Sequence, residues 1–465
     1  MTNLGYTPEE PIAAISTALA PGAIGIVRTS GKDCIQNVTK IFSRPKALLE
    51  AKGNTLVYGW IIDSNKNKID EVMLGVYRDG KSFTGEDMVE IFCHGGVNVV
   101  SSILKLLLEN GFRQAQRGEF TFRAYINGKT DLTKAEAIRE IIDSKTNESR
   151  THAASRLSGS LYQEIDKIKT DIVDTLASIE VEIEYPEDEE TISETFDSAK
   201  LLASQKALQA LVDSWKSEKL YQDGARIVLC GKTNAGKSSL FNSLLKEERA
   251  IVSDIEGTTR DFLESWANFD GIPVRLFDTA GLRKTSDVIE AKGVEITKDL
   301  SQEADIILYL IDASSGIVQD DIDFIKAQKN SPLVIVLNKC DKSNSISLSE
   351  YEKLSPYAVK ISAKNGEGIG NLTQLVKNIL TEKINSTQES GHTTTGLGSQ
   401  RQKESVAEAL ERINHALETV ETGELGLDAV VQDLEDCLDN LGEVTGSVTP
   451  DDVLGSIFAN FCVGK

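Results

Sequence analysis

Hydrophobic positions recur every three or four residues along Leu157–Ile183, which is the period of an amphipathic helix. The apolar side chains of this stretch are spaced 4, 4, 3, 4, 4, 3 and 4 residues apart. Pro186 and an acidic run, Glu187–Glu190, follow the pattern. We therefore expect one long helix that ends before Pro186, then a solvated loop, and then a second helix over residues 198–219.

The same helical period returns near the end of the chain, along Val406–Val420 and again along Val430–Leu441. Residues 385–399, just before it, have loop composition and no apolar period, which predicts a linker. Each amphipathic helix needs a partner for its apolar stripe. The simplest arrangement packs the early and late helices together, so that the part between them is an insertion into a discontinuous helical domain.

The first 125 residues show a different pattern, typical of a mixed α/β domain. Runs rich in β-branched and aromatic residues are bounded by Gly and Asp, and we expect strands there and one helix. The expected strands are Ile24–Arg28, Thr55–Ile62, Glu71–Tyr77 and Val89–Cys93, and the expected helix is Val99–Leu108.

Three polar, glycine-containing stretches separate these elements: Ser82–Asp87, His94–Gly96 and Arg117–Phe120. Loops of this kind on a small scaffold line binding sites, but ordinary turns have the same composition. The residues alone leave both readings open.

These patterns predict a multidomain α/β and α protein of four segments. The N-terminal α+β domain covers 1–125, the first part of the helical domain 126–222, an inserted P-loop domain 223–384, and the second part of the helical domain 385–465.

The inserted domain begins with a glycine-rich stretch, Gly231–Ser238, that has the P-loop spacing G-x-x-x-x-G-K-S. It follows the apolar run Ile227–Leu229 and precedes a helical pattern that starts at Leu240. The glycines allow backbone N–H groups to close around phosphate oxygens at a helix N-terminus. Lys237 is expected to reach the β/γ-phosphates, and Ser238 to ligate Mg²⁺.

Two motifs after the P-loop are suited to the metal and the γ-phosphate. Gly257–Asp261 contains Thr259, the expected switch threonine for Mg²⁺. Asp278–Gly281 follows a strand pattern over Val274–Phe277, so Asp278 can hold the water shell of the metal.

Two later motifs are suited to the base. Asn338–Asp341 follows the strand pattern Leu333–Leu337, and the Asp341 carboxylate can accept hydrogen bonds from guanine N1–H and N2–H₂, which adenine does not offer. Ser362–Lys364 is expected to support the base from another loop. Five motifs in this order predict a guanine-nucleotide domain whose ligand lies at the carboxyl ends of the strands.

The residues expected to bind GTP come from these five motifs and from the positions next to them. They are Asn234, Ala235, Gly236, Lys237, Ser238, Ser239, Ser253, Asp254, Ile255, Glu256, Gly257, Thr258, Thr259, Asp278, Thr279, Ala280, Gly281, Asn338, Lys339, Asp341, Ser362, Ala363 and Lys364.

The group that activates water is not the usual one. Ras-like GTPases orient water with a glutamine directly after the Asp-x-x-Gly motif, whereas this chain has Leu282 there. Arg283 is either an arginine finger or a solvent-facing switch residue. A bound cation can also neutralise developing phosphate charge, and Asn234 with the segment 253–258 offers oxygen atoms for one.

Net charge and cysteine content limit the kinds of partner and the cellular compartment that we expect for this protein. The net charge of −22 argues against non-specific nucleic-acid binding by the whole surface, so any RNA contact needs a local basic patch. No basic-then-apolar leader opens the sequence and no apolar run reaches membrane-spanning length, which predicts a cytoplasmic protein without a membrane partner. Six cysteines without metal-ligand spacing suit a reducing cytosol: Cys34, Cys93, Cys230, Cys340, Cys437 and Cys462.

The layout resembles the MnmE (TrmE) family of tRNA modification GTPases over the whole chain. Three signatures outside the P-loop domain carry the resemblance. They are Gly85–Glu90 with His94–Gly96, Arg117–Ala124 leading to Asn127–Leu132, and the Cys-x-Gly-Lys of Phe461–Lys465, with Arg117 where we expect proline.

The resemblance implies a tetrahydrofolate-type fold in an N-terminal domain that also forms a homodimer. It implies a site for 5-formyltetrahydrofolate or a related folate that uses Arg28, Glu90, Lys129 and Lys465. Glu90 can pair with the donor edge of the pterin, and a basic residue can meet the glutamate tail. Cys462 is either a structural cysteine or one that lies near the folate one-carbon unit. A prenylation box is rejected because Lys465 is not a usual last residue.

For the P-loop domain, the resemblance implies K⁺ held by Asn234, Ser253, Ile255 and Thr258, in a site completed when two such domains meet. It implies Glu290 as the catalytic residue, acting on water, although spacing alone does not separate Glu290 from Asp287 or Glu295.

The implied function is GTP hydrolysis that, with a flavin-dependent partner in a heterotetramer, adds a carboxymethylaminomethyl or aminomethyl group at C5 of the wobble uridine of certain tRNAs. The alternatives are a GTP-timed switch that binds ribosomes or RNA, and a folate-dependent one-carbon transferase with a regulatory GTP-binding domain. A switch of the first kind should carry a basic appended domain, and the termini here are acidic or neutral.

Overall fold

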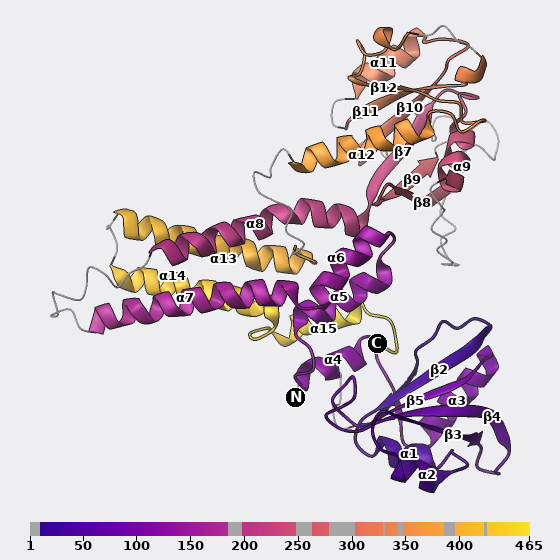
Figure 1. Ribbon diagram of the computed structural model, residues 1–465, viewed down its shortest axis with the longest axis vertical. Helices are drawn as coiled ribbons and strands as arrows, with labels where there is room; N and C mark the ends of the chain where they lie inside the picture. Colours follow the sequence, from indigo (N-terminus) through magenta and orange to yellow (C-terminus); the bar gives the residue numbers. More distant parts are fainter. Residues whose placement is uncertain are drawn as a thin grey trace. The chain divides into compact units, whose positions relative to one another are not determined.

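A computed structural model describes residues 10–184, 198–247, 263–278, 303–328, 331–342, 347–385, 396–422 and 426–465 (Figure 1). The chain divides into two compact units. The first contains residues 1–139, 162–198 and 411–465, and the second contains residues 140–161 and 199–410. The expected fold class, α/β together with α, is confirmed, whereas the division into four domains stays a prediction.

The first unit contains a six-stranded sheet with the order β3-β4-β5-β2-β1-β6. Neighbouring strands are antiparallel except β1 and β6. The strands are β1 (Ile12–Ile15), β2 (Gly22–Ser30), β3 (Thr55–Ile62), β4 (Lys68–Tyr77), β5 (Met88–Gly95) and β6 (Arg113–Gln114). All four expected strands are present, and the sequence pattern did not predict β1 or β6.

Alternation along these strands gives the sheet two different faces. One face is packed with buried side chains such as Val57, Leu74 and Ile91, against α1 (Cys34–Thr39), α2 (Pro45–Glu50) and α3 (Val97–Glu109). The other, which we call the open face, carries Tyr58, Met73 and Phe92 in register across β3, β4 and β5. Arg28 and Glu90 also lie on the open face, in register on β2 and β5.

Helix α4 (Glu119–Ile126) corrects one expectation. The stretch Arg117–Phe120 was expected to be a loop, but the turn ends at Gly118, which has a φ of 68°, and the helix begins at Glu119. A Cβ atom at Gly118 would lie 2.5 Å from the carbonyl oxygen of Phe458, so this turn has room for glycine alone.

The expected single helix over Leu157–Ile183 is also wrong at its start. Helix α6 (Asn147–Leu157) ends there, Gly159 adopts a φ of 100°, and α7 (Ser160–Glu184) begins afterwards. The apolar positions from Leu161 to Ile179 are buried as the period predicts, whereas Leu157 is 36% exposed because it ends a different helix.

Five further described helices do not belong to either sheet domain. They are α5 (Leu132–Asp143), α8 (Ser198–Asp223), α13 (Gln400–Thr422), α14 (Leu427–Thr445) and α15 (Asp451–Ala459). The expected late helices correspond to α13 and α14. None of the helices that the structure describes is long and apolar enough to cross a membrane.

The second unit contains another six-stranded sheet, with the order β12-β11-β10-β7-β9-β8, in which β8 alone is antiparallel to its neighbour. Strands β10 and β11 are buried almost throughout, as expected for parallel strands covered on both faces. The elements are β7 (Ala225–Gly231), α9 (Lys237–Glu247), β8 (Leu263–Phe269), β9 (Ile272–Asp278), β10 (Ile306–Asp312), α11 (Gln319–Ala327), β11 (Leu333–Asn338), two short 3₁₀ turns at Cys340–Lys342 and Leu348–Glu350, β12 (Tyr357–Lys360) and α12 (Ile369–Asn385).

A buried ion-pair cluster fixes the helices that lead into this sheet. The guanidinium of Arg156 on α6 pairs with Glu140 at 2.5 Å and with Glu218 on α8 at 2.7 Å. His152, one turn earlier on α6, lies 2.8 Å from the same Glu218 carboxylate. Because Arg156 is 1% exposed, loss of one partner would leave a buried charge, so α6 and α8 are held in one register.

Candidate functional site

The P-loop of the second unit connects β7 to α9 at the carboxyl end of the sheet. Gly236 has a φ of 100°, and a Cβ atom there would lie 2.1 Å from the Asn338 amide nitrogen. The Lys237 ammonium donates to the carbonyls of Gly231 and Lys232 at 2.7 and 2.9 Å. The loop therefore has the shape of a phosphate cradle, with its lysine inside and a helix N-terminus at its end.

Two oxygen ligands meet beside this loop. The hydroxyl of Ser238, the second residue of α9, donates to the Asp278 carboxylate at 3.0 Å. Asp278 is the last residue of β9, and its side chain is buried. A hydroxyl and a carboxylate at this separation form the hard-oxygen set that Mg²⁺ prefers, so these residues fit the metal.

A second group of residues lies at the ends of β11 and β12. The Asn338 amide donates to the Ala235 carbonyl at 2.8 Å, and its oxygen accepts from the Ala363 amide at 3.0 Å. The Ser362 hydroxyl donates to the Asp341 carboxylate at 2.8 Å. The motifs expected to read the base are therefore joined to each other and to the P-loop, with one Asp341 oxygen oriented by Ser362.

The structure adds one residue that the motifs did not identify, Asp312 at the end of β10. The Lys339 ammonium lies 2.6 Å from the Asp312 carboxylate and donates to the Asn234 carbonyl at 2.7 Å. Burial disfavours the charged carboxylate, but hydrogen bonds from Lys339 and Ser314 lower its pKa to about 2. The available signal was its place at the end of an apolar strand between two motif strands.

Replacing Asp312 with asparagine is expected to weaken guanine-nucleotide binding about threefold to tenfold, because Lys339 loses its charged partner and positions the loop less firmly. The pKa of Asp312 lies below its ordinary 3.8, so the pair stabilises the fold above that pH and is lost only as the pH falls towards 2. A fluorescent-GDP titration at pH 7 measures the effect. Asp323→Asn, on the exposed side of α11, is the control, and equal affinities for both variants would contradict this role.

Several expected residues lie outside the described part of the chain. Among them are all the switch residues, the remaining K⁺ ligands and the catalytic glutamate. They are Ser253, Asp254, Ile255, Glu256, Gly257, Thr258, Thr259, Thr279, Ala280, Gly281 and Glu290.

A second candidate site lies on the open face of the sheet in the first unit. The Arg28 guanidinium lies 2.8 Å from the Glu90 carboxylate and donates to the Gly464 carbonyl at 3.2 Å. The Ser16 hydroxyl donates to the same carbonyl at 3.3 Å. The Lys465 amide follows Gly464, so three of the four expected folate residues, Arg28, Glu90 and Lys465, come together.

Aromatic rings surround the Arg28 guanidinium. The ring centroids of Phe83 and Phe120 lie 5.6 and 5.7 Å from it, and the Tyr77 hydroxyl contacts Glu90 at 3.5 Å. Burial and the nearby Arg28 lower the pKa of the Lys465 ammonium. A carboxylate, cations and flat apolar faces are the groups that a pterin with an acidic tail requires, so the residues present fit a folate.

Two other expected residues are placed differently. The Lys129 ammonium donates to the Gly80 carbonyl at 2.6 Å, beside the loop that carries Phe83, and among the described residues it makes no hydrogen bond or ion pair with Arg28 or Glu90. Cys462 is exposed, and its carbonyl accepts from the Gly118 amide at 3.4 Å.

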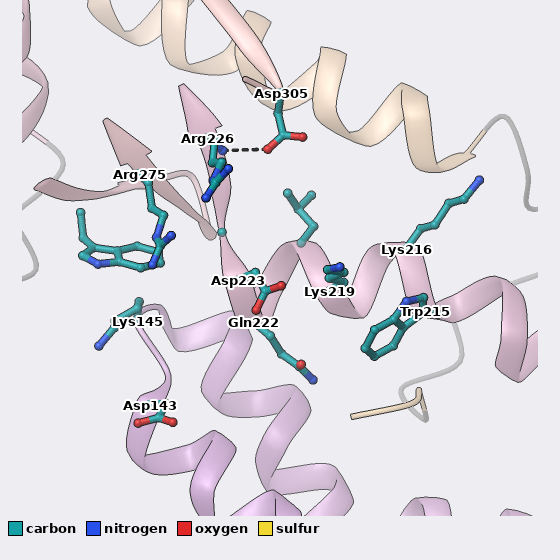
Figure 2. Close-up of a pocket in the computed structure, with 13 residues that line it drawn as sticks. Asp143, Lys145, Trp215, Lys216, Lys219, Gln222, Asp223, Arg226, Arg275 and Asp305 are labelled. Atoms are coloured by element: carbon teal, nitrogen blue, oxygen red, sulfur yellow. Dashed lines mark hydrogen bonds between the residues drawn. The ribbon is translucent and has the colours of Figure 1, made fainter. Parts of the chain in front are cut away.

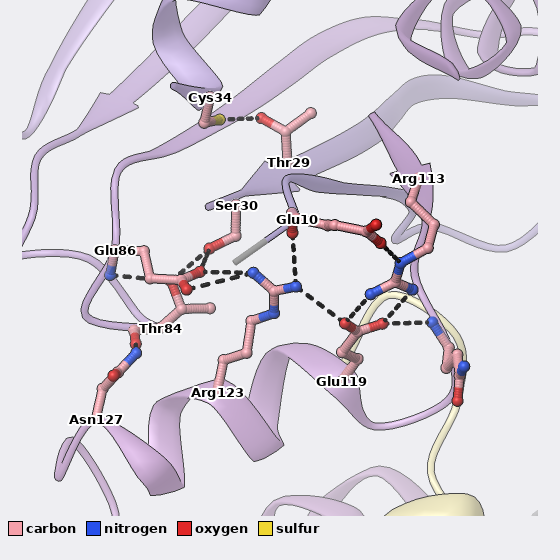
Figure 3. Close-up of polar contacts among 11 residues, drawn as sticks. Glu10, Thr29, Ser30, Cys34, Thr84, Glu86, Arg113, Glu119, Arg123 and Asn127 are labelled. Carbon is pink, nitrogen blue, oxygen red and sulfur yellow. Dashed lines mark hydrogen bonds and ion pairs between the residues drawn. The ribbon is translucent and has the colours of Figure 1, made fainter. Parts of the chain in front are cut away.

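The signature residues Glu86, Glu119 and Arg123 form an internal network rather than a surface site (Figure 3). Arg123 pairs with Glu86 at 3.1 Å and with Glu119 at 3.0 Å, and Arg113 pairs with Glu119 at 2.6 Å. Burial of Glu119 disfavours its charge, but the hydrogen bonds from Arg113 and the Gln116 amide and the charges of Arg123 and Arg113 together outweigh burial and lower its pKa. The network holds the 82–87 loop against α4, so these residues support the open face and do not line it.

Comparison with known families covers both units. The family described as "MnmE helical domain" matches residues 132–462, and the family described as "GTP-binding protein TrmE N-terminus" matches residues 11–129.

Similar full-length proteins share one name, tRNA modification GTPase MnmE. The protein of Treponema denticola is 50% identical over 471 residues, that of Treponema pallidum 41% over 498, and that of Borrelia recurrentis 40% over 466. In each case the similarity covers 99% of this chain and 99% of the relative.

Proposed function

Because this chain belongs to the MnmE (TrmE) family of tRNA modification GTPases, we propose that it binds and hydrolyses GTP in the modification of tRNA. One observation carries the proposal. The P-loop, the Ser238–Asp278 pair and the joined Asn338 and Ser362 loops lie together at one edge of the second sheet. Such a convergence at the carboxyl ends of parallel strands is suited to a guanine nucleotide.

The roles of the described residues follow from their positions. Backbone amides of the P-loop and the Lys237 ammonium hold the phosphates, while Asp341 reads the base. Ser238 and Thr259 would ligate Mg²⁺, and Asp278 would hold the water shell of the metal. When bound, Mg²⁺ neutralises charge on the β- and γ-phosphates. We propose that Glu290 orients the attacking water.

Hydrolysis is proposed to depend on K⁺ as well. Leu282 occupies the place where a Ras-like enzyme has its water-orienting glutamine, so another source of positive charge is needed. Asn234 stands in the P-loop and would supply a side-chain oxygen to K⁺, and Ser253, Ile255 and Thr258 would complete the set of ligands.

Replacing K⁺ with Na⁺ is expected to slow GTP hydrolysis at least about tenfold and to leave nucleotide affinity nearly unchanged, because the cation acts on charge that develops in the transition state. Turnover in matched chloride salts, with affinity measured in parallel, tests this. Equal turnover in both salts would remove K⁺ from the mechanism.

The first unit is proposed to bind a folate at Arg28, Glu90 and Lys465, with Lys129 at the edge of the site. Cys462 is a candidate neighbour of the one-carbon unit. The exposed apolar residues Leu56 and Tyr58, 61% and 48% exposed on the same open face, support homodimerisation through that face.

The wider reaction is proposed from the family. The chain would work in the cytoplasm with a flavin-dependent partner in a heterotetramer. Together they would add a carboxymethylaminomethyl or aminomethyl group at C5 of the wobble uridine of certain tRNAs. Mass analysis of wobble uridine in a strain that lacks this gene tests the proposal. We expect the modified nucleoside to disappear and to return with the intact gene, and an unchanged nucleoside profile would overturn the proposed function.

A further inference from the structure

The second unit contains a cavity of about 770 Å³ beside the end of α8 (Figure 2). Helix α8, the segment that precedes α6, and strands β7, β8 and β9 contribute to its walls. The lining residues are Asp143, Lys145, Trp215, Lys216, Lys219, Leu220, Gln222, Asp223, Gly224, Arg226, Trp266, Arg275 and Asp305.

Positively charged side chains outnumber carboxylates in the lining of the cavity, although its two arginines pair with glutamates outside the lining. Its five cationic residues face three carboxylates, although the whole chain has a net charge of −22. Lys145, Lys216 and Lys219 make no ion pair with any residue in the described ranges. The charges of these three ammonium groups are therefore not neutralised by salt bridges among the described residues, and the groups are available to an anionic ligand.

Two of the three tryptophans of the chain line the same cavity. Trp266 lies on β8, opposite Arg275 on β9, and the Arg275 guanidinium is 4.9 Å from its ring centroid. The Lys145 ammonium is 5.9 Å from the same ring. Trp215 comes from α8, so indole surface and cations are supplied by separate walls.

The backbone at this point keeps the wall in place. Gly224, between α8 and β7, has a φ of 71°, and a Cβ atom there would lie 2.6 Å from the Trp266 ring. Arg226 donates its backbone N–H to Asp305 at 2.8 Å and pairs with Glu303 at 2.6 Å. The aromatic wall is thus built by close packing between the turn and β8.

We propose that this cavity binds an unpaired segment of the tRNA substrate. The lysines would contact phosphates, and an unstacked base would lie against indole surface, which is how proteins hold single-stranded RNA. The volume falls in the range of sites that enclose small ligands, and so has room for a nucleotide. The inference rests on the proposed function in tRNA modification and adds the place where RNA is held.

This position is separate from the nucleotide site on the same sheet. Arg226 is the second residue of β7, whereas the P-loop starts at Gly231, the last residue of that strand. RNA and GTP would therefore occupy opposite ends of β7, and the two ligands would not compete for space.

The first test measures the affinity for an unmodified tRNA transcript with uridine at its wobble position. The double variant Lys216→Ala/Lys219→Ala of the full chain should bind this tRNA about tenfold more weakly at moderate salt. The slope of log affinity against log salt concentration should decrease in magnitude by about two, because two phosphate contacts are lost. The matched control is Lys46→Ala/Lys52→Ala, which removes two exposed lysines of the first unit and should change neither quantity. A melting temperature within a degree or two of the unmodified protein shows that each variant is folded.

The second test uses the tryptophans as reporters. In a Trp60→Phe background, tRNA should quench fluorescence from Trp215 and Trp266. In a Trp215→Phe/Trp266→Phe background, the remaining Trp60 signal should not change. Saturable quenching by uridine monophosphate with an affinity equal to that of tRNA would overturn the proposal in favour of a free-nucleotide site.

The outcomes separate this inference from the proposed function. If the lysine variant and its control bind tRNA equally, the cavity is not the RNA site, although the modification function stands. If the strain that lacks the gene keeps its modified uridine, the function itself fails, whatever the cavity binds.

Discussion

Replacing Asp341 with asparagine is expected to weaken GTP binding by about 10²–10³-fold and to make xanthosine nucleotides the preferred ligands. The carboxylate accepts two hydrogen bonds from guanine N1–H and N2–H₂, and charge-assisted bonds of this kind each contribute about 1.5–3 kcal/mol. An asparagine amide offers one acceptor and one donor, which matches the carbonyl that xanthine has in place of the amino group. Ser362, which donates to Asp341 at 2.8 Å, keeps the side chain oriented towards the base.

Competition titrations of GTP against XTP measure this change. Asp323→Asn is a suitable control because this carboxylate is exposed on α11 and accepts a hydrogen bond from Gln319 of the same helix. A variant at Asp341 that keeps its preference for guanine would show that another group reads the base.

Replacing Glu290 with alanine is expected to reduce GTP turnover about 10²–10⁴-fold, the usual contribution of a group that orients or deprotonates water. Glu290 lies outside the described residues, so this expectation rests on the family resemblance. The nucleotide contacts come from other loops, and GTP affinity should therefore change little, as for an interaction made mainly in the transition state.

Single-turnover hydrolysis in K⁺ buffer measures the Glu290 effect, and Asp287→Ala is the matched control from the same segment. If Asp287→Ala is slow and Glu290→Ala is normal, the residue assignment is wrong and the GTPase assignment survives. If neither variant is slow, water is oriented by a group outside this segment.

The nucleotide site was predictable because each of its parts is encoded locally. Glycine spacing specifies the P-loop, and a polar residue directly after an apolar run, such as Asp278 or Asn338, marks the carboxyl end of a strand. The sheet order then brings these ends to one edge. Asp312 escaped prediction because its importance comes from Lys339, a partner directly after the neighbouring strand β11 that no motif spacing links to it.

The helix boundaries were less predictable, because the apolar period alone does not reveal where one helix ends and the next begins. Leu157 continues the spacing of α7 although it belongs to α6, and the deciding feature is the backbone of Gly159, which has a φ of 100°. Glycine is permitted within a helical pattern, so its left-handed conformation became evident only from the structure.

The N-terminal signatures show a different limit. Glu86 and Glu119 lie in stretches that were expected to be either site-lining loops or ordinary turns, yet both carboxylates pair with the buried Arg123 guanidinium on α4. Sequence reveals that charged residues are present in such a stretch, but whether they face solvent, a ligand or each other depends on long-range packing. The residues that do gather on the open face, Arg28 and Glu90, were identified through the family resemblance.

The contact between Arg28 and Gly464 has a consequence for how the protein is made. The two residues are separated by 436 positions, and Ser16 and Gly464 by 448. At a synthesis rate of about 5–20 residues per second, the ribosome needs roughly 20–90 s after Arg28 before Gly464 is joined to the chain. During that time the first sheet can fold while its Arg28–Glu90 pair stays without the segment that covers it. The candidate folate site is therefore a late product of translation, and a nascent chain stalled in the second unit would carry a folded sheet that lacks it.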